Sequence, residues 1–523
     1  MSASATESGH DELSKSLEFL EEMDQYEPLA ARRQAYLGIN RWIARQPDTD
    51  DWTLDPLTDE LPRYLSDVLR KMRPDESRFQ EEDISYLQAH MFLRDIARFA
   101  AETAPPDPLV EQWIAADTTL TEEQRRDLSV TARMFDWTVR SIQLTPSRPN
   151  LRHRKPSVGP RQLKLDEVAK EASVPPASRV GPGELFYVSE TLLKGHGDMV
   201  DRARIFILLS RQWGIPVVVL AREDDEFVEP QPWLCGAVIG AQLYLFDTAL
   251  GLPIPHVDRS GIATLEYVHT HPEILRELDA PDEPYPVRAG DVRRVTVQLD
   301  ASPQALSRRM RLVERRLTGD RKMILTAQPS ELAARLQDVS GVGRIEILRA
   351  PYVVLRYRKE LQTKIRKDKK TANPIARQLI VVQSMPPLFQ ARLLHFRGQF
   401  DAHGVQAGAK SLYLTCRPPD AVLKEMATDE NSSQMRLVVA GKQAASYWMG
   451  LVTYDNSKYN AAEDWFAQRT LRASPNGPWT HGARYNLGRI WEMLNEPQRA
   501  QEIYRADDSP QRAGNSVRAA LLD

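Results

Sequence analysis

Residues 195–221 read GHGDMVDRARIFILLSRQWGIPVVVLA and contain signals for a helix followed by a strand. Asp198 precedes an apolar run, and its carboxylate can accept the free N–H groups of a first helical turn, which predicts a helix start there. Gly214 and Pro216 predict the helix end, because glycine favours a C-terminal cap and proline cannot continue a helix. The apolar, β-branched run at 217–221 then predicts a buried strand.

A hairpin is predicted at residues 232–255, PWLCGAVIGAQLYLFDTALGLPIP. Segments 234–239 and 242–246 have the apolar composition of strands, and Gly240 between them predicts a tight turn. The expected order is therefore helix, short break, strand and hairpin, with Asp247 at the end of the last strand.

The helical part resembles the core helix of the transglutaminase-like family, which has a papain-type fold. In that family a cysteine opens the helix, and an aspartate and an alanine follow two and four residues later. Here Met199 stands at the cysteine position, while Asp201 and Ala203 match the other two. The Gly-Ile-Pro at 214–216 also matches the family order.

The strands carry the rest of the resemblance. The family places His-Ala-Trp on one strand and an aspartate on the next, and the match puts Trp233 at the tryptophan and Asp247 at the aspartate. Gln231 then occupies the histidine position. Another register does not recover a histidine, because none occurs between Gly197 and Pro255.

The substituted positions determine what chemistry the resemblance implies. The family reaction is acyl transfer, in which a thiolate attacks a carboxamide, a histidine moves protons and an aspartate orients the histidine. Met199 has no ionisable proton, and Gln231 does not titrate. We therefore expect a catalytically inactive protein that needs no cofactor or metal. Its groove is expected to hold a peptide beside Trp233, Asp247 and Asp201.

An enzyme is the alternative interpretation. It would be a hydrolase or acyltransferase of the cysteine-protease-like class that uses a non-standard nucleophile such as Cys235. A metal held by His269 and His271 is a second version, although two histidines without a third ligand are weak grounds for a metal site.

Composition limits the other classes. The chain has 523 residues, which predicts about three to four domains. A net charge of −3 gives no general affinity for nucleic acid. No apolar run reaches the ~18 residues of a membrane span, and the polar N-terminus has no signal-peptide core. We expect a cytoplasmic protein as the sequence is written, or an exported one if a signal peptide has been removed.

The predicted fold is a multidomain α+β protein. The expected order is a disordered or helical segment 1–28, a helical domain 29–145, a basic Pro-rich linker 146–182, the transglutaminase-like core 183–290, a small α/β unit with a basic run 291–385, and a tetratricopeptide-like helical region 386–523. Helices are expected at 84–101 and 119–142, with Trp137 in the core. Strands are expected at 293–299, 322–327, 343–348 and 352–358.

The C-terminal prediction rests on small residues at repeated spacing. Gly450 is followed by Ala462 and Phe466, and Gly488 by Ala500 and Tyr504, at the same distances along the chain. This spacing resembles the tetratricopeptide repeat, in which small residues let paired helices approach and the aromatic ring fills the space between them. A weaker copy begins at Gly398. Such repeats imply a protein or peptide partner.

Overall fold

The computed structural model describes residues 3–23, 26–46, 51–146, 185–223, 229–281, 283–368, 370–371, 373–404, 406–427 and 432–522. Helices make up 58% of the chain and strands 10%, which confirms the predicted mixture of helix and sheet in a multidomain chain. The predicted linker at 146–182 lies, apart from Pro146, outside these residues. Among the described residues, no helix combines the length and the apolar character that a membrane span requires.

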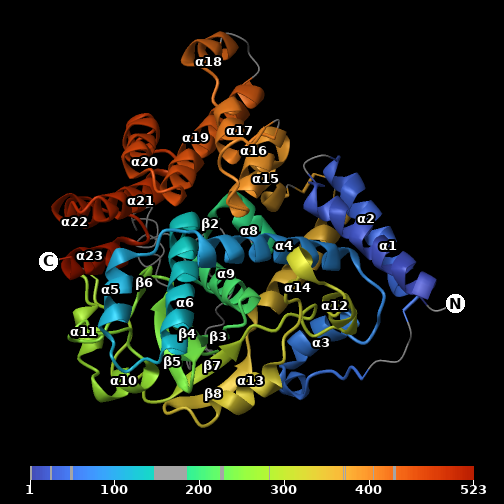
Figure 1. The fold of residues 1–523 in the computed structure, drawn as a ribbon, viewed down its shortest axis with the longest axis horizontal. Coiled ribbons are helices and arrows are strands. Elements are labelled where there is room, and N and C mark those ends of the chain that lie inside the picture. Colours follow the sequence, from blue (N-terminus) through green and yellow to red (C-terminus); the bar gives the residue numbers. More distant parts are fainter. Residues whose placement is uncertain are drawn as a thin grey trace, which may run out of the picture.

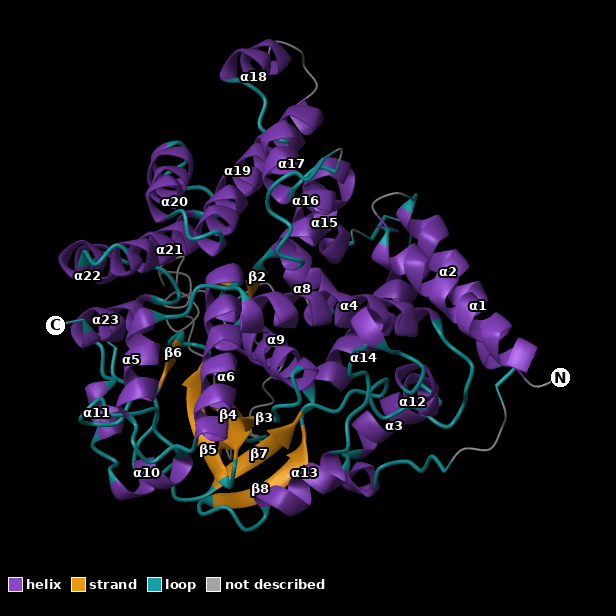
Figure 2. Ribbon diagram, in the orientation of Figure 1, coloured by secondary structure: helices purple, strands orange, loops and turns teal. Residues whose placement is uncertain are grey.

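Six strands form the main sheet, in the order β6-β5-β4-β3-β7-β8 (Figure 2). Their bounds are β3 (Val217–Arg222), β4 (Gln231–Ile239), β5 (Gln242–Asp247), β6 (Leu252–Pro253), β7 (Val295–Leu299) and β8 (Val342–Ile347). Neighbouring strands are antiparallel except β7 and β8, which are parallel. The β4–β5 hairpin turns at Gly240, whose φ of 62° suits a residue without a side chain. The strand and hairpin predicted between residues 217 and 246 are therefore confirmed.

The sheet extends beyond the predicted core. β7 and β8 come from the segment 291–385, which the sequence predicts as a separate small α/β unit, yet β7 pairs directly with β3. A single sheet therefore joins the two regions. The sequence did not predict this pairing, because nothing local to either segment specifies it.

Two of the strands predicted in this segment are wrong. Residues 322–327 contain no strand, and residues 352–358 lie in the helix α14 (Ala350–Lys367). Pro351 stands in the first turn of α14, where its missing N–H costs nothing and its fixed φ favours the helix. That start signal outweighs the short β-branched run that follows it.

Helices cover one face of the sheet. α9 (Met199–Gln212) and α6 (Glu122–Ser141) pack on the strands, and α4 (Glu81–Glu102) packs on both of these helices (Figure 1). The rings of Phe135, Phe206 and Phe246, from α6, α9 and β5, have centroids 5.2 or 5.3 Å apart. The predicted helices 84–101 and 119–142 are thus confirmed, and they share one hydrophobic core with the sheet.

The other face of the sheet is covered by short helices and connecting segments. These helices are α10 (Leu265–Thr270), α11 (Ile274–Glu277) and α13 (Pro329–Leu336). Trp233, Leu243 and Leu245 point from the strands into this second core, which also contains Leu265, Ile274 and Leu336.

The remaining elements that precede the C-terminal helices surround this centre. They are α1 (Ala3–Glu21), α2 (Pro28–Ile43), η2 (Pro56–Glu60), α3 (Arg63–Lys71), α5 (Pro108–Ala116), β1 (Gln143–Leu144), α8 (Val188–Lys194), β2 (His196–Gly197), α12 (Arg308–Glu314) and η5 (Gly319–Arg321). α1 begins within the segment predicted as disordered or helical, and it pairs with α2. β1 and β2 form a short parallel pair that holds the end of α6 beside the start of α9.

The C-terminal region is helical throughout its described part. It comprises α15 (Pro374–Ser384), α16 (Pro386–Phe396), α17 (Ala409–Thr415), α18 (Asp420–Ala427), α19 (Ser432–Asp455), α20 (Tyr459–Phe466), the π-helix η6 (Ala467–Arg472), α21 (Thr480–Met493), α22 (Pro497–Arg505) and α23 (Arg512–Leu521). α19 packs against α20, and α21 packs against α22. In Figure 1 these helices lie above and to the left of the sheet.

The predicted small residues lie at these helix contacts. A Cβ atom on Gly450 would lie 2.6 Å from the Phe466 ring, and one on Gly488 would lie 2.4 Å from Tyr504. Both contacts are closer than a side chain allows, so only glycine fits at either position. Gly398 differs, because it follows α16 with φ of 70° and does not lie between two paired helices.

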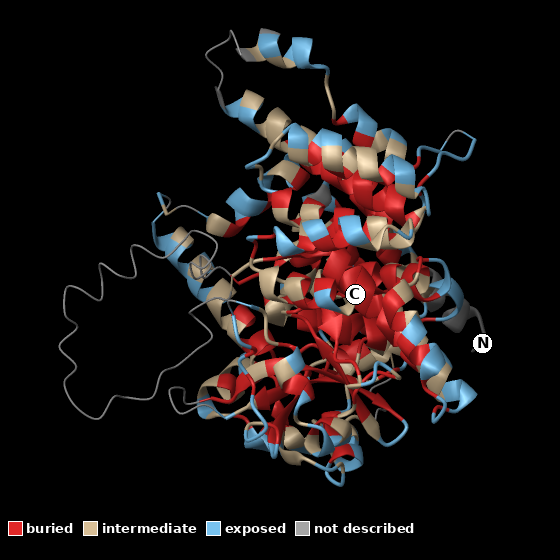
Figure 3. Cartoon of the chain, turned by 90° about the vertical axis from the view of Figure 1, so that its left-hand side faces the viewer, coloured by how far each residue is buried: buried red, intermediate tan, exposed pale blue. Residues whose placement is uncertain are grey.

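The last helix returns to the sheet region. α23 passes so close to the connection after β5 that a Cβ on Gly514 would lie 1.8 Å from the carbonyl oxygen of Leu250. Figure 3 shows buried residues concentrated where the helices and the sheet meet, whereas α18 is exposed on most sides. The C-terminal helices therefore pack on the rest of the molecule along a buried interface, here called the seam, in which α16 contacts α4, α21 contacts α6, and α23 contacts the connection after β5.

Candidate functional site

The start of α9 is where the sequence places a groove. Asp198 caps the helix, because its carboxylate accepts from the N–H groups of Val200 and Asp201, each at 3.0 Å. The carboxylate of Asp201 accepts in return from the N–H of Asp198 at 3.3 Å. Asp201, predicted as a binding residue, thus completes a capping box.

The three matched catalytic positions are only partly brought together. Met199 is the first residue of α9, and its carbonyl oxygen accepts from the Thr248 hydroxyl at 3.0 Å, so the end of β5 touches the helix start. Gln231 opens β4, where its side-chain amide donates to the carbonyl oxygen of Glu229 at 2.8 Å. The helix start and the end of β5 therefore lie side by side. Gln231 makes its hydrogen bond within its own segment.

Asp247 is a structural acceptor in this environment. One carboxylate oxygen accepts from the N–H groups of Ala249 and Leu250, at 2.8 and 2.9 Å. The other accepts from the hydroxyl of Tyr285 at 2.6 Å, and that hydroxyl accepts from the indole N–H of Trp233, also at 2.6 Å. Burial raises the pKa of Asp247, although these hydrogen bonds oppose the shift. Trp233 and Asp247 are buried, so neither presents an exposed surface to a peptide.

Sequence reasoning missed Tyr285, which links these two residues. It lies in the irregular stretch around 281–290, where no periodic pattern marks a buried position. The only sequence features that could have indicated a buried side chain there are the tyrosine itself and the prolines on either side of it.

The alternative nucleophile is inaccessible. Cys235 is fully buried in β4, and burial raises the pKa of its thiol, with the Asp247 carboxylate adding to the shift. A protonated thiol without solvent contact is a poor nucleophile. Cys416 is also buried, and burial raises its pKa to about 11.

The candidate histidines do not converge. His269 contacts the carbonyl oxygen of Val292 through Nε2, whereas His271 stacks on Tyr267 with ring centroids 4.3 Å apart. His256 stacks on the same Tyr267 ring at 4.0 Å, so it lies at α10. The pairing of His269 with His271 as metal ligands has no support in this geometry.

A buried arginine occupies the space beside the start of α9. Arg202 donates to the carbonyl oxygens of Val139, Ile142 and Thr248 and to the side-chain oxygen of Gln511, at distances of 2.7–3.2 Å. Burial lowers the pKa of Arg202 to about 10, because all four acceptors are neutral. The residue joins α6, the end of β5 and the segment before α23. Its sequence offers no separate signal, because Arg204 and Arg211 lie in the same helix.

A buried ion network joins the N-terminal helices to the C-terminal ones. Arg140 pairs with Asp136 at 2.7 Å and with Asp455 of α19 at 2.8 Å. Asp107, beside α5, pairs with Arg489 of α21 and with Arg518 of α23. The two arginines lower the pKa of Asp107 well below its usual range despite its burial. This network is the polar part of the seam between the two regions.

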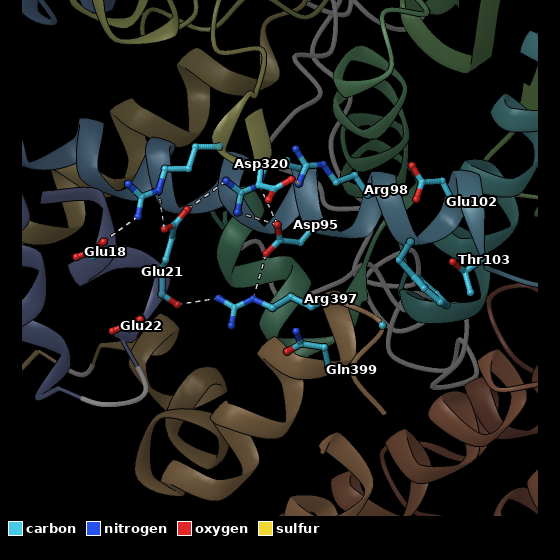
Figure 4. A pocket seen from close by; sticks show the side chains of 14 residues that line it. Glu18, Glu21, Glu22, Asp95, Arg98, Glu102, Thr103, Asp320, Arg397 and Gln399 are labelled. Carbon is cyan, nitrogen blue, oxygen red and sulfur yellow. Dashed lines mark hydrogen bonds and ion pairs between the residues drawn. The ribbon is translucent and has the colours of Figure 1, made fainter. Parts of the chain in front are cut away.

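A cavity of about 570 Å³ opens between α1, α4 and residues 397–399 (Figure 4). Its arginines pair with its carboxylates: Arg94 with Glu21 and Asp95, Arg98 with Asp320, Arg321 with Glu18 and Glu21, and Arg397 with Asp95. Figure 4 shows these side chains directed toward one another across the cavity wall. Six carboxylates line the cavity and all four arginines are paired with them, so the cavity offers no surplus positive charge to an anionic ligand.

A second cavity, here called the C-terminal cleft, behaves differently. It has a volume of about 450 Å³ and lies between α17, α18, α19, η6 and the start of α21. Its charged lining residues are Arg417, Lys442 and Arg469 against one carboxylate, Asp420. Lys442 pairs with Asp420 at 2.7 Å, so this carboxylate is not left for the two arginines.

The two arginines of the cleft gather on one ring. The guanidinium carbons of Arg417 and Arg469 lie 4.6 and 4.7 Å from the centroid of Trp465. Arg469 pairs with Asp464 at 2.7 Å, whereas Arg417 donates to the Ser446 hydroxyl at 2.9 Å. Among the described residues, no carboxylate lies within ion-pair distance of Arg417. Burial lowers the pKa of Arg417, and the charge of Arg469 adds to the shift. An anion placed here would therefore relieve a repulsion.

Uncharged groups complete the cleft. Gln443 donates from its amide to the hydroxyl of Ser474 at 2.9 Å, and Trp479 and Pro478 supply apolar surface. A volume of this size lies within the range of ~300–1,000 Å³ typical of ligand pockets. Sequence reasoning missed these residues, because positions 417 and 469 are far apart in the chain and neither lies in a charge run.

Comparisons with known proteins add no family to this description. Neither a scan against protein-family models nor searches of curated proteins and of solved structures found a match to this chain.

Proposed function

We propose that the protein is a non-catalytic binding protein that holds an extended acidic segment of a partner protein in the C-terminal cleft. The observation that carries the proposal is the pair of arginines on Trp465, of which Arg417 has no carboxylate partner in the part of the chain that the structure describes. A glutamate or aspartate side chain would supply the missing charge, and such charge-assisted hydrogen bonds are among the stronger ones. The apolar surface at Pro478 and Trp479 suits the side chains between the acidic ones.

The transglutaminase-like core is a scaffold in this proposal. Met199 cannot act as a nucleophile, Gln231 cannot act as a base, and Asp247 is committed to three hydrogen bonds. Arg202 uses the space beside the helix start to bind neutral acceptors of three segments. The core thereby supports the helices that carry the cleft.

Peptide binding tests the first half of the proposal. A fluorescein-labelled peptide rich in aspartate and glutamate should bind, and a matched peptide with asparagine and glutamine should not. Arg417→Ala and Arg469→Ala should each weaken binding by about tenfold or more. Arg499→Ala is the matched control, because Arg499 also stacks on a tryptophan, Trp491, at 4.4 Å but pairs with glutamates outside the cleft. Equal losses in all three variants would contradict the assignment of the site.

Amine incorporation into a glutamine peptide tests the second half. The wild-type protein and Met199→Cys should show no turnover, because a new thiol without a base stays protonated at its pKa of ~8.5. Met199→Cys combined with Gln231→His should recover a trace at most. Turnover by the wild type that disappears after alkylation of the cysteines would overturn the non-catalytic assignment.

A further inference from the structure

Three metal-ligating side chains meet at a junction of the C-terminal helices. His481 is in the first turn of α21, and Asp507 and Asp508 follow α22 in the connection to α23. One ligand atom of each residue lies within 4.8 Å of the other two. No local sequence pattern marks these residues as a group, because 26 positions separate the histidine from the nearer aspartate (481 to 507).

The second observation is a pair of buried atoms without hydrogen bonds. Within the described part of the chain, His481 Nδ1 and Asp507 Oδ1 are buried and have no hydrogen-bond partner. The Asp507 side chain is 0% exposed. Buried polar atoms are paired in the great majority of cases, so two unpaired ones in the same cluster indicate a missing partner. A cation satisfies both, since it accepts lone pairs from nitrogen and oxygen alike.

Neighbouring residues fix the orientation of Asp507. Its Oδ2 accepts from the Ser509 hydroxyl and, at 2.8 Å, from the side-chain amide of Asn515. Oδ1 is consequently held toward the cluster, as an outer shell of hydrogen bonds holds a metal ligand.

One cationic side chain already contacts the cluster. Arg484, one turn after His481, pairs with Asp508 and lies 4.0 Å from Asp507 Oδ1. The arginine side chain is 30% exposed, so it can move into solvent without crossing the protein. A metal ion and Arg484 would therefore compete for Asp508.

We propose that His481, Asp507 and Asp508 bind a divalent transition-metal ion of the zinc type, with Arg484 as its competitor. An imidazole nitrogen with carboxylate oxygens favours zinc, cobalt or manganese, whereas magnesium and calcium prefer oxygen alone. The ion would fasten the start of α21 to the connection between α22 and α23. This inference does not depend on the proposed peptide-binding function.

Calorimetry on the full chain, first stripped with a chelator, tests the site with Zn²⁺, Co²⁺ and Mg²⁺ as probes. One equivalent of Zn²⁺ should bind, Mg²⁺ should not, and bound Co²⁺ should give a visible absorption spectrum of nitrogen and oxygen ligation. Asp508→Asn and His481→Ala should abolish this binding, and Ser509→Ala should weaken it by about 10–100-fold. Arg484→Gln should tighten it, a result that a merely structural cluster would not give.

The controls separate this site from incidental metal binding. His403→Ala removes an exposed histidine elsewhere and should change nothing. Asp508 is exposed, so Asp508→Asn should fold normally and keep the test valid even if His481→Ala does not. The proposal is overturned if no metal binds stoichiometrically. Water would then be the partner of His481 Nδ1 and Asp507 Oδ1. The proposal is equally overturned if His403→Ala and Asp508→Asn lose binding to the same extent.

Discussion

The start of α9 and the C-terminal cleft both gather polar side chains beside a helix, but they treat charge in opposite ways. At α9 the acceptors of Asp247 and the donors of Arg202 are all used within the molecule. In the cleft Arg417 and Arg469 share one aromatic ring, and Arg417 has no carboxylate partner among the described residues. A site whose groups are satisfied internally has little to offer a ligand. A site with an unpaired charge can bind a group of opposite charge without breaking an existing ion pair.

Removing a charge from the buried ion network between the N-terminal and C-terminal helices should have the largest effect on stability. Asp107→Ala leaves Arg489 and Arg518 buried without this partner and should lower the free energy of unfolding by about 3–5 kcal/mol. Denaturant unfolding measures the change. Asp59→Ala, at an exposed position, is the control and should stay within ~0.5 kcal/mol. A small effect of Asp107→Ala would mean that the seam is not held by its ion network.

Overpacking a helix contact should have the next largest effect. Gly488→Leu places a side chain where even Cβ would lie 2.4 Å from Tyr504, and should cost about 1–3 kcal/mol in thermal or denaturant unfolding. Gly290→Leu, at a position with open space around it, should cost much less. Similar losses in the two variants would remove the reason for glycine at the α21–α22 contact.

The pH dependence of stability should differ between Asp107 and Asp247. The lowered pKa of Asp107 gives stability above the ordinary carboxyl pKa of ~3.9, and this stability is lost as the pH falls through the lowered value. The raised pKa of Asp247 has the opposite sign, because the folded state holds its proton longer and loses stability as the pH rises from ~3.9 through the raised value.

Two variants separate these contributions. Asp247→Asn should flatten the loss of stability on the alkaline side of ~3.9, and Asp107→Asn should flatten the loss on the acidic side. Unfolding curves recorded across this pH range measure both slopes. Parallel pH profiles for the wild type and Asp247→Asn would show that the buried carboxylate does not titrate in this window.

The smallest effect on stability is expected in the cleft. Arg469→Ala should change the free energy of unfolding by less than ~0.5 kcal/mol, because Arg469 and its partner Asp464 are about half exposed. Thermal unfolding of the variant checks this value. A larger loss would mean that the arginine stabilises η6 rather than serving a ligand.

The sequence predicted the elements that are specified locally. Asp198, Gly214 and Pro216 set the ends of α9 within a few residues, and Thr121 caps α6 by a capping box. The pairing of β3 with β7 was not predictable in this way, because about 75 residues separate the paired positions (221 to 296) and both strands are apolar. The β-branched run at 352–358 predicted a strand wrongly, because the proline that precedes it favours the start of a helix.

The candidate sites were predicted less well than the fold. Met199 and Gln231 were enough to argue against acyl transfer, but the burial of Trp233 depends on Tyr285, about 50 residues later (233 to 285). The arginines of the cleft become neighbours only through Trp465, which the pattern of any one helix does not specify. Charge surplus is a property of the assembled molecule, so it has no signature in a single segment.

Arg202 also has a consequence for how the molecule is made. Its acceptor Gln511 lies 309 residues further along the chain, so a ribosome that adds ~5–20 residues per second presents α9 roughly 15–60 s before this partner exists. During that interval the Arg202 guanidinium group lies in a core that still lacks its acceptor Gln511. We expect vectorial synthesis to leave the α6–α9 layer loosely docked until α23 emerges, and chaperones to engage it meanwhile. Force measurements on stalled nascent chains should record the final docking only after residue 511 has left the ribosomal tunnel.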